Sequence, residues 1–254
     1  MNSRLVLLAC LLGSLACASA ETRHGASMVQ TRPPFDASRL RTGHFLYRTV
    51  HRGKDAGTSN ISVVRLDERT YRFRNEVTGA FRQTWESTAT SSFEPLSVTL
   101  GLGERDDTSI SMNLTYDGQA VTGTATKIDP VEGRRTNAVA AHIPFDTVDQ
   151  RIDWAAMMAS PLTPGEQISF SVYDPWIGVS PVSARIFDAE QVRVPAGEFD
   201  AYRVIYRIEK SRHVEQYEIW VSTESPHFLV REAFPNGAVT ELIQVTPSVR
   251  NTAK

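Results

Sequence analysis

Apolar and polar side chains alternate along most of this chain, and this period of two constrains the fold more than any other feature. Tyr71, Phe73 and Val77 alternate with charged residues, as they would on a strand with one buried and one solvent-exposed face. The same alternation recurs in later segments: residues 110–116, 121–128, 168–172, 202–208, 217–221, 228–230 and 239–245. Turn-forming residues separate nearly all of them, and helices do not alternate with the strands. The sequence therefore predicts an all-β, mainly antiparallel fold, either a curved sandwich or a partly open barrel.

One segment near the middle of the chain departs from the period of two. Between Asp149 and Ala159 the apolar residues fall at helical spacing, which predicts one short helix. Thr147 and Gln150 are placed to form a capping box at its start. This helix would lie across the sheets, or bridge two similar halves of the molecule that are joined near residues 147–165.

The first twenty residues have the order of a secretory signal peptide. Arg4 supplies an early positive charge, an apolar stretch follows, and small residues end the segment at Ala20. Cleavage near Ala20 would leave a periplasmic or secreted protein. The alternative is a lipoprotein attached through Cys17. The apolar stretch is too short to cross a bilayer as a helix and no later stretch is more hydrophobic, so we predict no transmembrane span.

The rest of the chain divides into three parts. Residues 21–42 show no periodicity and include adjacent prolines, which predicts a mobile N-terminal lead-in. Residues 43–246 carry the alternating segments and form the expected β-rich domain. Residues 247–254 are the expected C-terminal tail.

Composition and motifs exclude several classes of function. The 27 Lys and Arg nearly balance the 29 Asp and Glu, so we predict no nucleic-acid partner. Both cysteines, Cys10 and Cys17, lie within the predicted signal peptide, which would leave no thiol in the mature chain. The six histidines are scattered without metal-ligand spacing, and the serine-hydrolase motifs are missing. We therefore predict no metal, no cofactor and no catalytic residues, and expect that the protein is not an enzyme.

The C-terminal half carries the landmarks of a known family. The segment Val194–Val204, with a Pro-Ala-Gly turn followed by Phe-Asp, precedes the strand Tyr217–Trp220 and the corner Pro226–Arg231. Together these resemble bacterial exported proteins of the domain of unknown function 3108 family. The resemblance covers residues 150–246 well and residues 43–149 more loosely. It implies a β-rich envelope protein, exported or lipid-anchored, and supplies no catalytic residues.

Four aromatic residues lie outside the cleanest alternating runs and are the candidate ligand-binding residues: Trp85, Trp154, Tyr173 and Trp176. Aromatic rings suit core packing, but they also suit the mouth of an apolar pocket. Our leading hypothesis is a non-catalytic periplasmic or envelope protein that holds an apolar ligand, such as a lipid chain, between the sheet and the helix. The alternative is a module with a solid interior that docks on another envelope protein. A hydrolase ranks last, because the fold would have to bring an acid and a base together.

Overall fold

The alternating segments form strands, and the helical segment forms one short helix. The first eight strands are β1 (Gly43–His51), β2 (Lys54–Arg65), β3 (Thr70–Gly79), β4 (Gln83–Thr90), β5 (Pro95–Glu104), β6 (Asp107–Asp117), β7 (Ala120–Asp129) and β8 (Gly133–His142). The others are β9 (Thr147–Asp149), β10 (Gln167–Asp174), β11 (Gly178–Val194), β12 (Gly197–Lys210), β13 (His213–Ser222), β14 (Leu229–Ala233) and β15 (Ala238–Pro247). The helical elements are the 3-10 turns η1 (Ala37–Arg39) and η2 (Gln150–Ile152) and the α-helix α1 (Asp153–Met158).

These strands pair into one sheet. The computed structural model describes residues 34–79, 82–104, 107–129 and 133–247. Within them, fifteen strands follow the order β8-β7-β6-β5-β4-β3-β2-β1-β15-β14-β13-β12-β11-β10-β9. Strands that follow one another in sequence therefore pair with one another, except β8 and β9, and the first strand pairs with the last. The pairs are antiparallel except β9 with β10, which is parallel, so the predicted mainly antiparallel β fold is confirmed.

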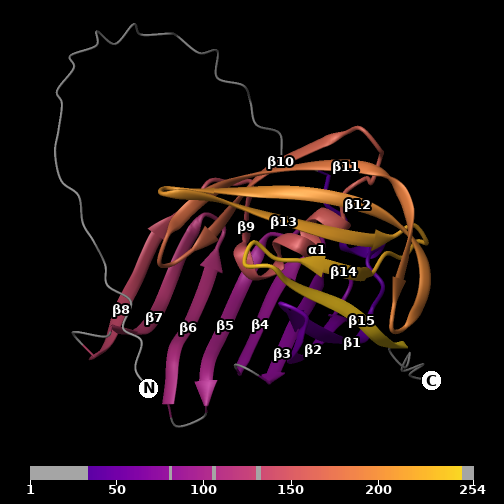
Figure 1. The fold of residues 1–254 in the computed structure, drawn as a ribbon. Coiled ribbons are helices and arrows are strands. Elements are labelled where there is room, and N and C mark those ends of the chain that lie inside the picture. Colours follow the sequence, from indigo (N-terminus) through magenta and orange to yellow (C-terminus); the bar gives the residue numbers. More distant parts are fainter. Residues whose placement is uncertain (1–33, 80–81, 105–106, 130–132, 248–254) are drawn as a thin grey trace, which may run out of the picture. The chain divides into compact units, whose positions relative to one another are not determined.

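The sheet curves into two layers with α1 between them. Figure 1 shows β1–β8 in one layer and the strands from β10 onward in the other. The edges of the sheet are β8 and β9, although only residues 143–146 separate these strands in the chain. The sheet is therefore not closed into a barrel, which agrees with the predicted curved, partly open architecture.

The helix lies in the main hydrophobic core. All six residues of α1 are buried, and aromatic side chains from distant parts of the chain pack around the same core. The ring of Phe35 lies edge-on to that of Phe170, with centroids 5.3 Å apart, and Phe73 packs against Phe93 at 5.5 Å. Burial of each such ring stabilises the fold by about 2 kcal/mol. The described residues include no helix long and apolar enough to span a membrane.

The helix is shorter than predicted, and the predicted capping box is wrong. Thr147 lies in β9, and its hydroxyl has no hydrogen-bond partner within the part of the chain that the structure describes. Gln150 opens η2, whose first turn is capped by Asp149: this carboxylate accepts a hydrogen bond from the backbone N–H of Arg151 at 2.9 Å. Because this cap holds the first turn as a 3-10 turn, the α-helix begins only at Asp153.

Part of the segment predicted as a mobile lead-in, residues 21–42, contacts the main core. Phe35 and Leu40 are buried in the main core. Two isolated apolar residues create no periodic pattern, so the sequence did not reveal that they pack. Residues 1–33, which contain the predicted signal peptide and both cysteines, lie outside the described residues, and so does most of the predicted tail, residues 248–254.

Candidate functional site

A cavity of about 440 Å³ lies between the start of the helical segment and the inner face of the sheet. Its volume falls within the range of small-molecule binding sites. On one side it is lined by apolar side chains of β2–β6: Ile61, Val77, Trp85, Leu100, Leu102 and Ile110. On the other side it is lined by side chains of β12, β13 and β15 and of the turn after β14: Tyr206, Tyr217, Phe234 and Ala238. The cavity thus has mainly apolar and aromatic walls.

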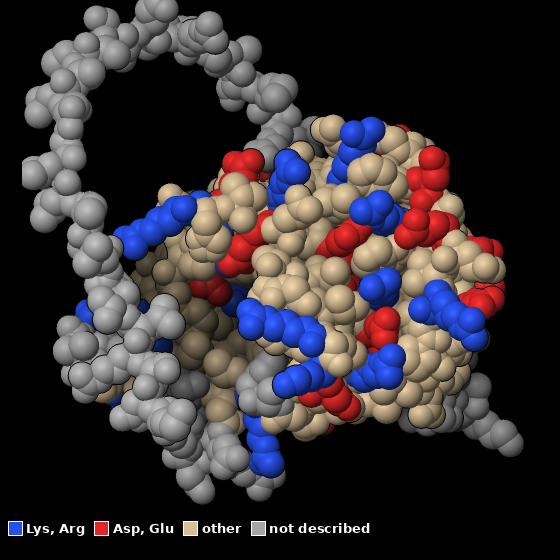
Figure 2. Space-filling model, viewed as in Figure 1, with Lys and Arg blue, Asp and Glu red and all other residues tan. Residues whose placement is uncertain are grey.

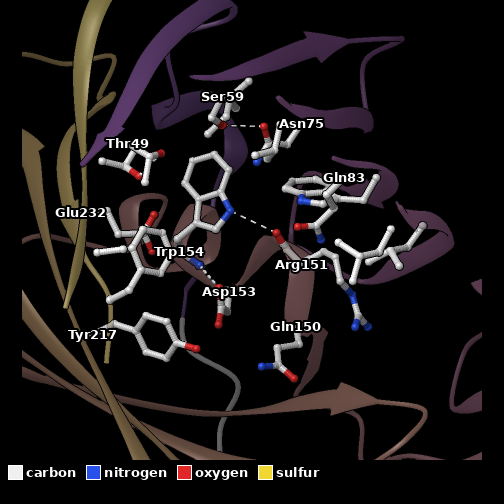
Figure 3. A pocket seen from close by; sticks show the side chains of 18 of the residues that line it. Thr49, Ser59, Asn75, Gln83, Gln150, Arg151, Asp153, Trp154, Tyr217 and Glu232 are labelled. Atoms are coloured by element: carbon white, nitrogen blue, oxygen red, sulfur yellow. Dashed lines mark hydrogen bonds between the residues drawn. The ribbon is translucent and has the colours of Figure 1, made fainter. Parts of the chain in front are cut away.

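Trp154 of α1 stands in the middle of this site (Figure 3). Its indole N–H donates a hydrogen bond to the backbone oxygen of Arg151 at 3.0 Å, which fixes the orientation of the ring. Gln150 and Arg151 of η2 line the same cavity. The short helix therefore directs polar and aromatic groups, together with the apolar walls, toward one space.

Three buried carboxyl residues line the cavity: Asp174, which is paired with Arg151, and Asp153 and Glu232, which have no cation in contact among the described residues. Asp153 at the start of α1 is 5% exposed, and Glu232 of β14 is 9% exposed. A carboxylate oxygen of Asp153 accepts a hydrogen bond from the backbone N–H of Trp154 at 2.6 Å. Glu232 has no side-chain hydrogen bond or ion pair to any residue that the structure describes. These two acids are the chemically distinctive groups of the site.

The surroundings favour the neutral form of both acids. Burial raises the pKa of Asp153 to about 7, although the hydrogen bond from the Trp154 backbone and the nearby Arg151 partly oppose this effect. Burial and then the negative charge of Asp153 raise the pKa of Glu232 to about 8. Near neutral pH, both groups therefore hold protons that an exposed carboxylate would have lost.

Two other buried acids, Asp149 and Asp174, form ion pairs with one cation, Arg151. The guanidinium of Arg151 donates to both carboxylate oxygens of Asp149, at 2.6 and 2.7 Å, and to Asp174 at 2.7 Å. The hydroxyl of Tyr116 donates to Asp149 at 2.6 Å. Burial alone would lower the pKa of Arg151, but the carboxylates of Asp149 and Asp174 raise it above its ordinary value. This arrangement is a compensated ion network that joins β9, η2 and β10.

Aromatic rings stand beside the uncompensated acids. Tyr206 and Tyr217 stack with their centroids 4.9 Å apart, and Phe234 lies edge-on to Tyr217 at 6.1 Å. The hydroxyl of Tyr217 donates to Glu215 at 2.8 Å. Burial raises the pKa of Tyr206 well above its usual value, so this phenol stays neutral. The end of the cavity near Glu232 is therefore aromatic as well as acidic.

The face of the molecule in Figure 2 shows no comparable separation of charge. Figure 2 shows Lys and Arg side chains intermixed with Asp and Glu over the face in view, with a recess between them. A ligand approaching this face would meet both signs of charge. This face therefore favours neither sign of charge in a ligand.

Three of the four aromatic residues proposed from the sequence line this cavity. These are Trp85, Trp154 and Trp176. Tyr173 does not line it: its ring lies edge-on to Tyr116, with centroids 6.4 Å apart, in a second hydrophobic cluster. Whether these residues contact a ligand remains a prediction.

Sequence reasoning missed the role of the two acids. Glu232 falls between Val230, which is buried, and Phe234, which lines the cavity, at the two-residue spacing of side chains on one face. The available signal was a charged residue at an inward-facing position of a strand. Asp153 gave no comparable signal, because an acidic residue is common in the first turn of a helix.

The comparisons with known proteins establish a family and a fold. Residues 46–243 match the family described as protein of unknown function, DUF3108. The fold is similar to a β-barrel-like protein of the domain of unknown function DUF1849 from Brucella abortus, with a TM-score of 0.54, 7% identity and coverage of 83% of this chain and 100% of that one. A weaker match, with a TM-score of 0.34 and 10% identity, covers 84% of this chain and 99% of a Bacteroides fragilis protein with a YmcC-like fold. No protein of curated function matches the sequence significantly.

Proposed function

This chain belongs to the DUF3108 family, whose description names no activity, and from its own structure we propose that it is a non-catalytic envelope protein that binds a small ligand with an apolar body. The observation that carries the proposal is the cavity of about 440 Å³ between the helical segment and the sheet. Protein interiors are normally packed to high density. A large cavity with apolar and aromatic walls at the centre of the fold is therefore best explained by a ligand that occupies it.

The two competing functions fit this site less well. An interaction module with a solid interior would leave no cavity of this size. A hydrolase that uses two carboxyl groups needs environments that push their pKa values apart, so that one acid stays ionised while the other holds its proton. Burial instead raises the pKa of both Asp153 and Glu232. We place the protein in the bacterial envelope because of the family resemblance and the character of the first twenty residues.

A neutral fluorescent probe tests ligand binding directly. We expect the wild-type protein to bind N-phenyl-1-naphthylamine with enhanced fluorescence, because this probe is apolar and uncharged at neutral pH. Val77 lines the cavity, and Val77→Trp should fill part of it and weaken binding about tenfold or more, equivalent to about 1.4 kcal/mol.

The matched control lies one residue along the same strand. Thr78 is exposed, and its side chain points to the opposite face of β3, so Thr78→Trp adds the same ring outside the cavity. This variant should bind the probe as the wild type does. Equal binding by both variants, or no binding by the wild type, would contradict the proposal. Native mass spectrometry of gently purified protein would then identify a ligand carried through purification.

A further inference from the structure

We infer that the cavity selects a ligand whose apolar body carries an organic cation, which the carboxyl groups of Asp153 and Glu232 and the rings of Trp154 and Tyr217 would hold. This inference rests on the proposed function and adds the chemical class of the ligand. Figure 3 shows these four side chains around the same part of the cavity. They come from α1, β13 and β14, so the site exists only in the folded chain.

Glu232 is the strongest indication of such a ligand. The residue is 9% exposed, lines the cavity and has no side-chain hydrogen bond or ion pair to any described residue. The charged group that acts on it is Asp153, which is also acidic. A buried carboxylate is normally paired, because leaving it unpaired costs several kcal/mol. A cationic group of a ligand would supply the partner that the described residues do not.

Asp153 has charged neighbours of both signs, but they are engaged elsewhere. Arg151 and Lys210 act on it from η2 and β12, and Asp149 opposes them from β9. Arg151 is held by the carboxylate of Asp149 at 2.6 Å, and the ammonium of Lys210 is held by Glu215 at 2.7 Å. Neither cation forms an ion pair with Asp153 in the described structure. The Asp153 carboxyl is thus also open to a cation in the cavity.

The walls favour an organic cation over a metal ion. A metal would require several converging ligands, and the described residues include no group of three or more His, Cys, Asp or Glu that could hold one. Aromatic faces attract alkylammonium groups, most strongly where water is excluded. Trp154 and Tyr217 provide such rings next to the acids, and the apolar side chains beyond them suit a hydrocarbon body.

The same geometry makes the binding of a cation depend on pH. A permanent cation binds the ionised acids better than the protonated ones, so its affinity should rise as pH increases and level off once both acids are ionised. The pKa values of about 7 for Asp153 and about 8 for Glu232 place this rise near neutral pH. The neighbouring tyrosines, Tyr47, Tyr206 and Tyr217, stay neutral in this range because burial raises their pKa values.

Three ligands with the same hydrocarbon chain test the inference by calorimetry: octyltrimethylammonium, 1-octanol and octanoate. At about pH 9 the cation should bind wild-type protein about tenfold more tightly than octanol, and octanoate should bind more weakly than octanol. At about pH 5.5 both acids are protonated, and the advantage of the cation over octanol should fall below about twofold. Octanoate binding as tightly as the cation at about pH 9 would overturn the inference.

Variants separate the acids from the rest of the molecule. The double variant Asp153→Asn with Glu232→Gln keeps the shape of both side chains and should lose the preference for the cation at about pH 9 while still binding octanol, which also shows that it is folded. Glu241→Gln removes one negative charge from an ion pair with Arg48 outside the cavity, and it should keep the preference. A cation preference that survives in the double variant would overturn the inference.

Failure of this inference differs from failure of the proposed function. Binding of octanol and octanoate without an advantage for the cation would leave the cavity as an apolar ligand site and refute only the cationic ligand. If the wild type binds none of the three ligands and does not bind the naphthylamine probe, both are refuted.

Discussion

Two groups of buried acids, Asp149 with Asp174 and Asp153 with Glu232, differ in whether a cation of the chain contacts them. Asp149 and Asp174 are held by the guanidinium of Arg151, which contacts both at 2.6 to 2.7 Å. Asp153 and Glu232 have no cation in contact among the residues that the structure describes. The first group is complete without a ligand and joins three elements of the fold. Asp174 and Arg151 of the first group line the cavity as Asp153 and Glu232 do, but only the second group lacks a partner.

The difference shows how to separate structural acids from functional ones. A buried charge destabilises a protein unless a partner compensates it, so acids without a partner are usually protonated. Where the chain supplies the partner, as Arg151 does, the acids hold the fold together. Where it does not, the acids weaken the fold at neutral pH, and a binding role is the best physical reason for their presence. Three sets of variants test this contrast, beginning with the largest effect.

Removing the shared cation should have the largest effect on stability. Arg151→Met leaves Asp149 and Asp174 buried without a partner, which should lower the free energy of unfolding at neutral pH by about 3–5 kcal/mol. Urea denaturation measures this value. Arg48→Met removes one partner of an exposed ion pair with Glu241 and should cost less than about 1 kcal/mol. Equal losses in the two variants would contradict the structural role of the network.

Removing an uncompensated acid should instead raise the free energy of unfolding. Glu232 has a raised pKa, so between about pH 4.5 and 8 the folded state binds more protons than the unfolded state, and stability falls as pH increases. The loss of stability is complete once the pH exceeds the pKa of Glu232 in the folded state. Glu232→Gln abolishes this contribution, so at about pH 9 the variant should be more stable than wild type by about 2–4 kcal/mol.

Urea denaturation across this pH range checks the curve. Below about pH 4.5 the wild type and Glu232→Gln should have similar stability, because the carboxyl is protonated in both states of the wild type. Asp174→Asn provides the contrast, since it weakens a paired acid and should destabilise the protein at about pH 9. Parallel stability curves for wild type and Glu232→Gln would show that Glu232 is not an uncompensated acid.

Two tyrosines should show the same contrast through smaller changes in the free energy of unfolding. Tyr116 donates a hydrogen bond to Asp149 at 2.6 Å inside the compensated network, and Tyr116→Phe should cost about 1.5–3 kcal/mol, because the acceptor is charged. The hydroxyl of Tyr206, which lines the cavity, makes no hydrogen bond with the described residues. Tyr206→Phe should therefore change the free energy of unfolding by less than about 0.5 kcal/mol. Thermal or urea denaturation of the pair gives both values, and the reverse order would contradict the assignment of the two environments.

Much of the fold could be predicted from the sequence, because alternation requires no knowledge of distant partners. The longest strand, β11, escaped notice since its inward positions include the small residues Ser180 and Ala184, which weaken the apolar signal. The outward ring of Phe187 weakens it further, because this ring lies beneath the guanidinium of Arg185 at 5.3 Å rather than in the core. The alternating pattern therefore fails to reveal a strand where small residues face inward and an aromatic ring faces outward.

The candidate site was predictable only in part. Three tryptophans drew attention as aromatic residues outside the alternating pattern, and they line the cavity. The sequence could not distinguish the acids that have a cationic partner from those that have none, because Asp149 and Asp153 look alike in it. The side chain of Arg151 lies between them in the chain yet forms its ion pairs with Asp149 and, 23 residues away, with Asp174. Such a choice depends on tertiary structure, which a local pattern does not contain.

One measurement tests the central contrast most directly: the carboxyl carbon-13 shift of Glu232, followed by NMR as pH is varied, with and without octyltrimethylammonium. In the free protein we expect the pKa of Glu232 to lie at about 8, and the bound cation should lower it. A pKa near the ordinary value of 4.5 in the free protein would mean that Glu232 is already compensated, and the account of the cavity would be wrong.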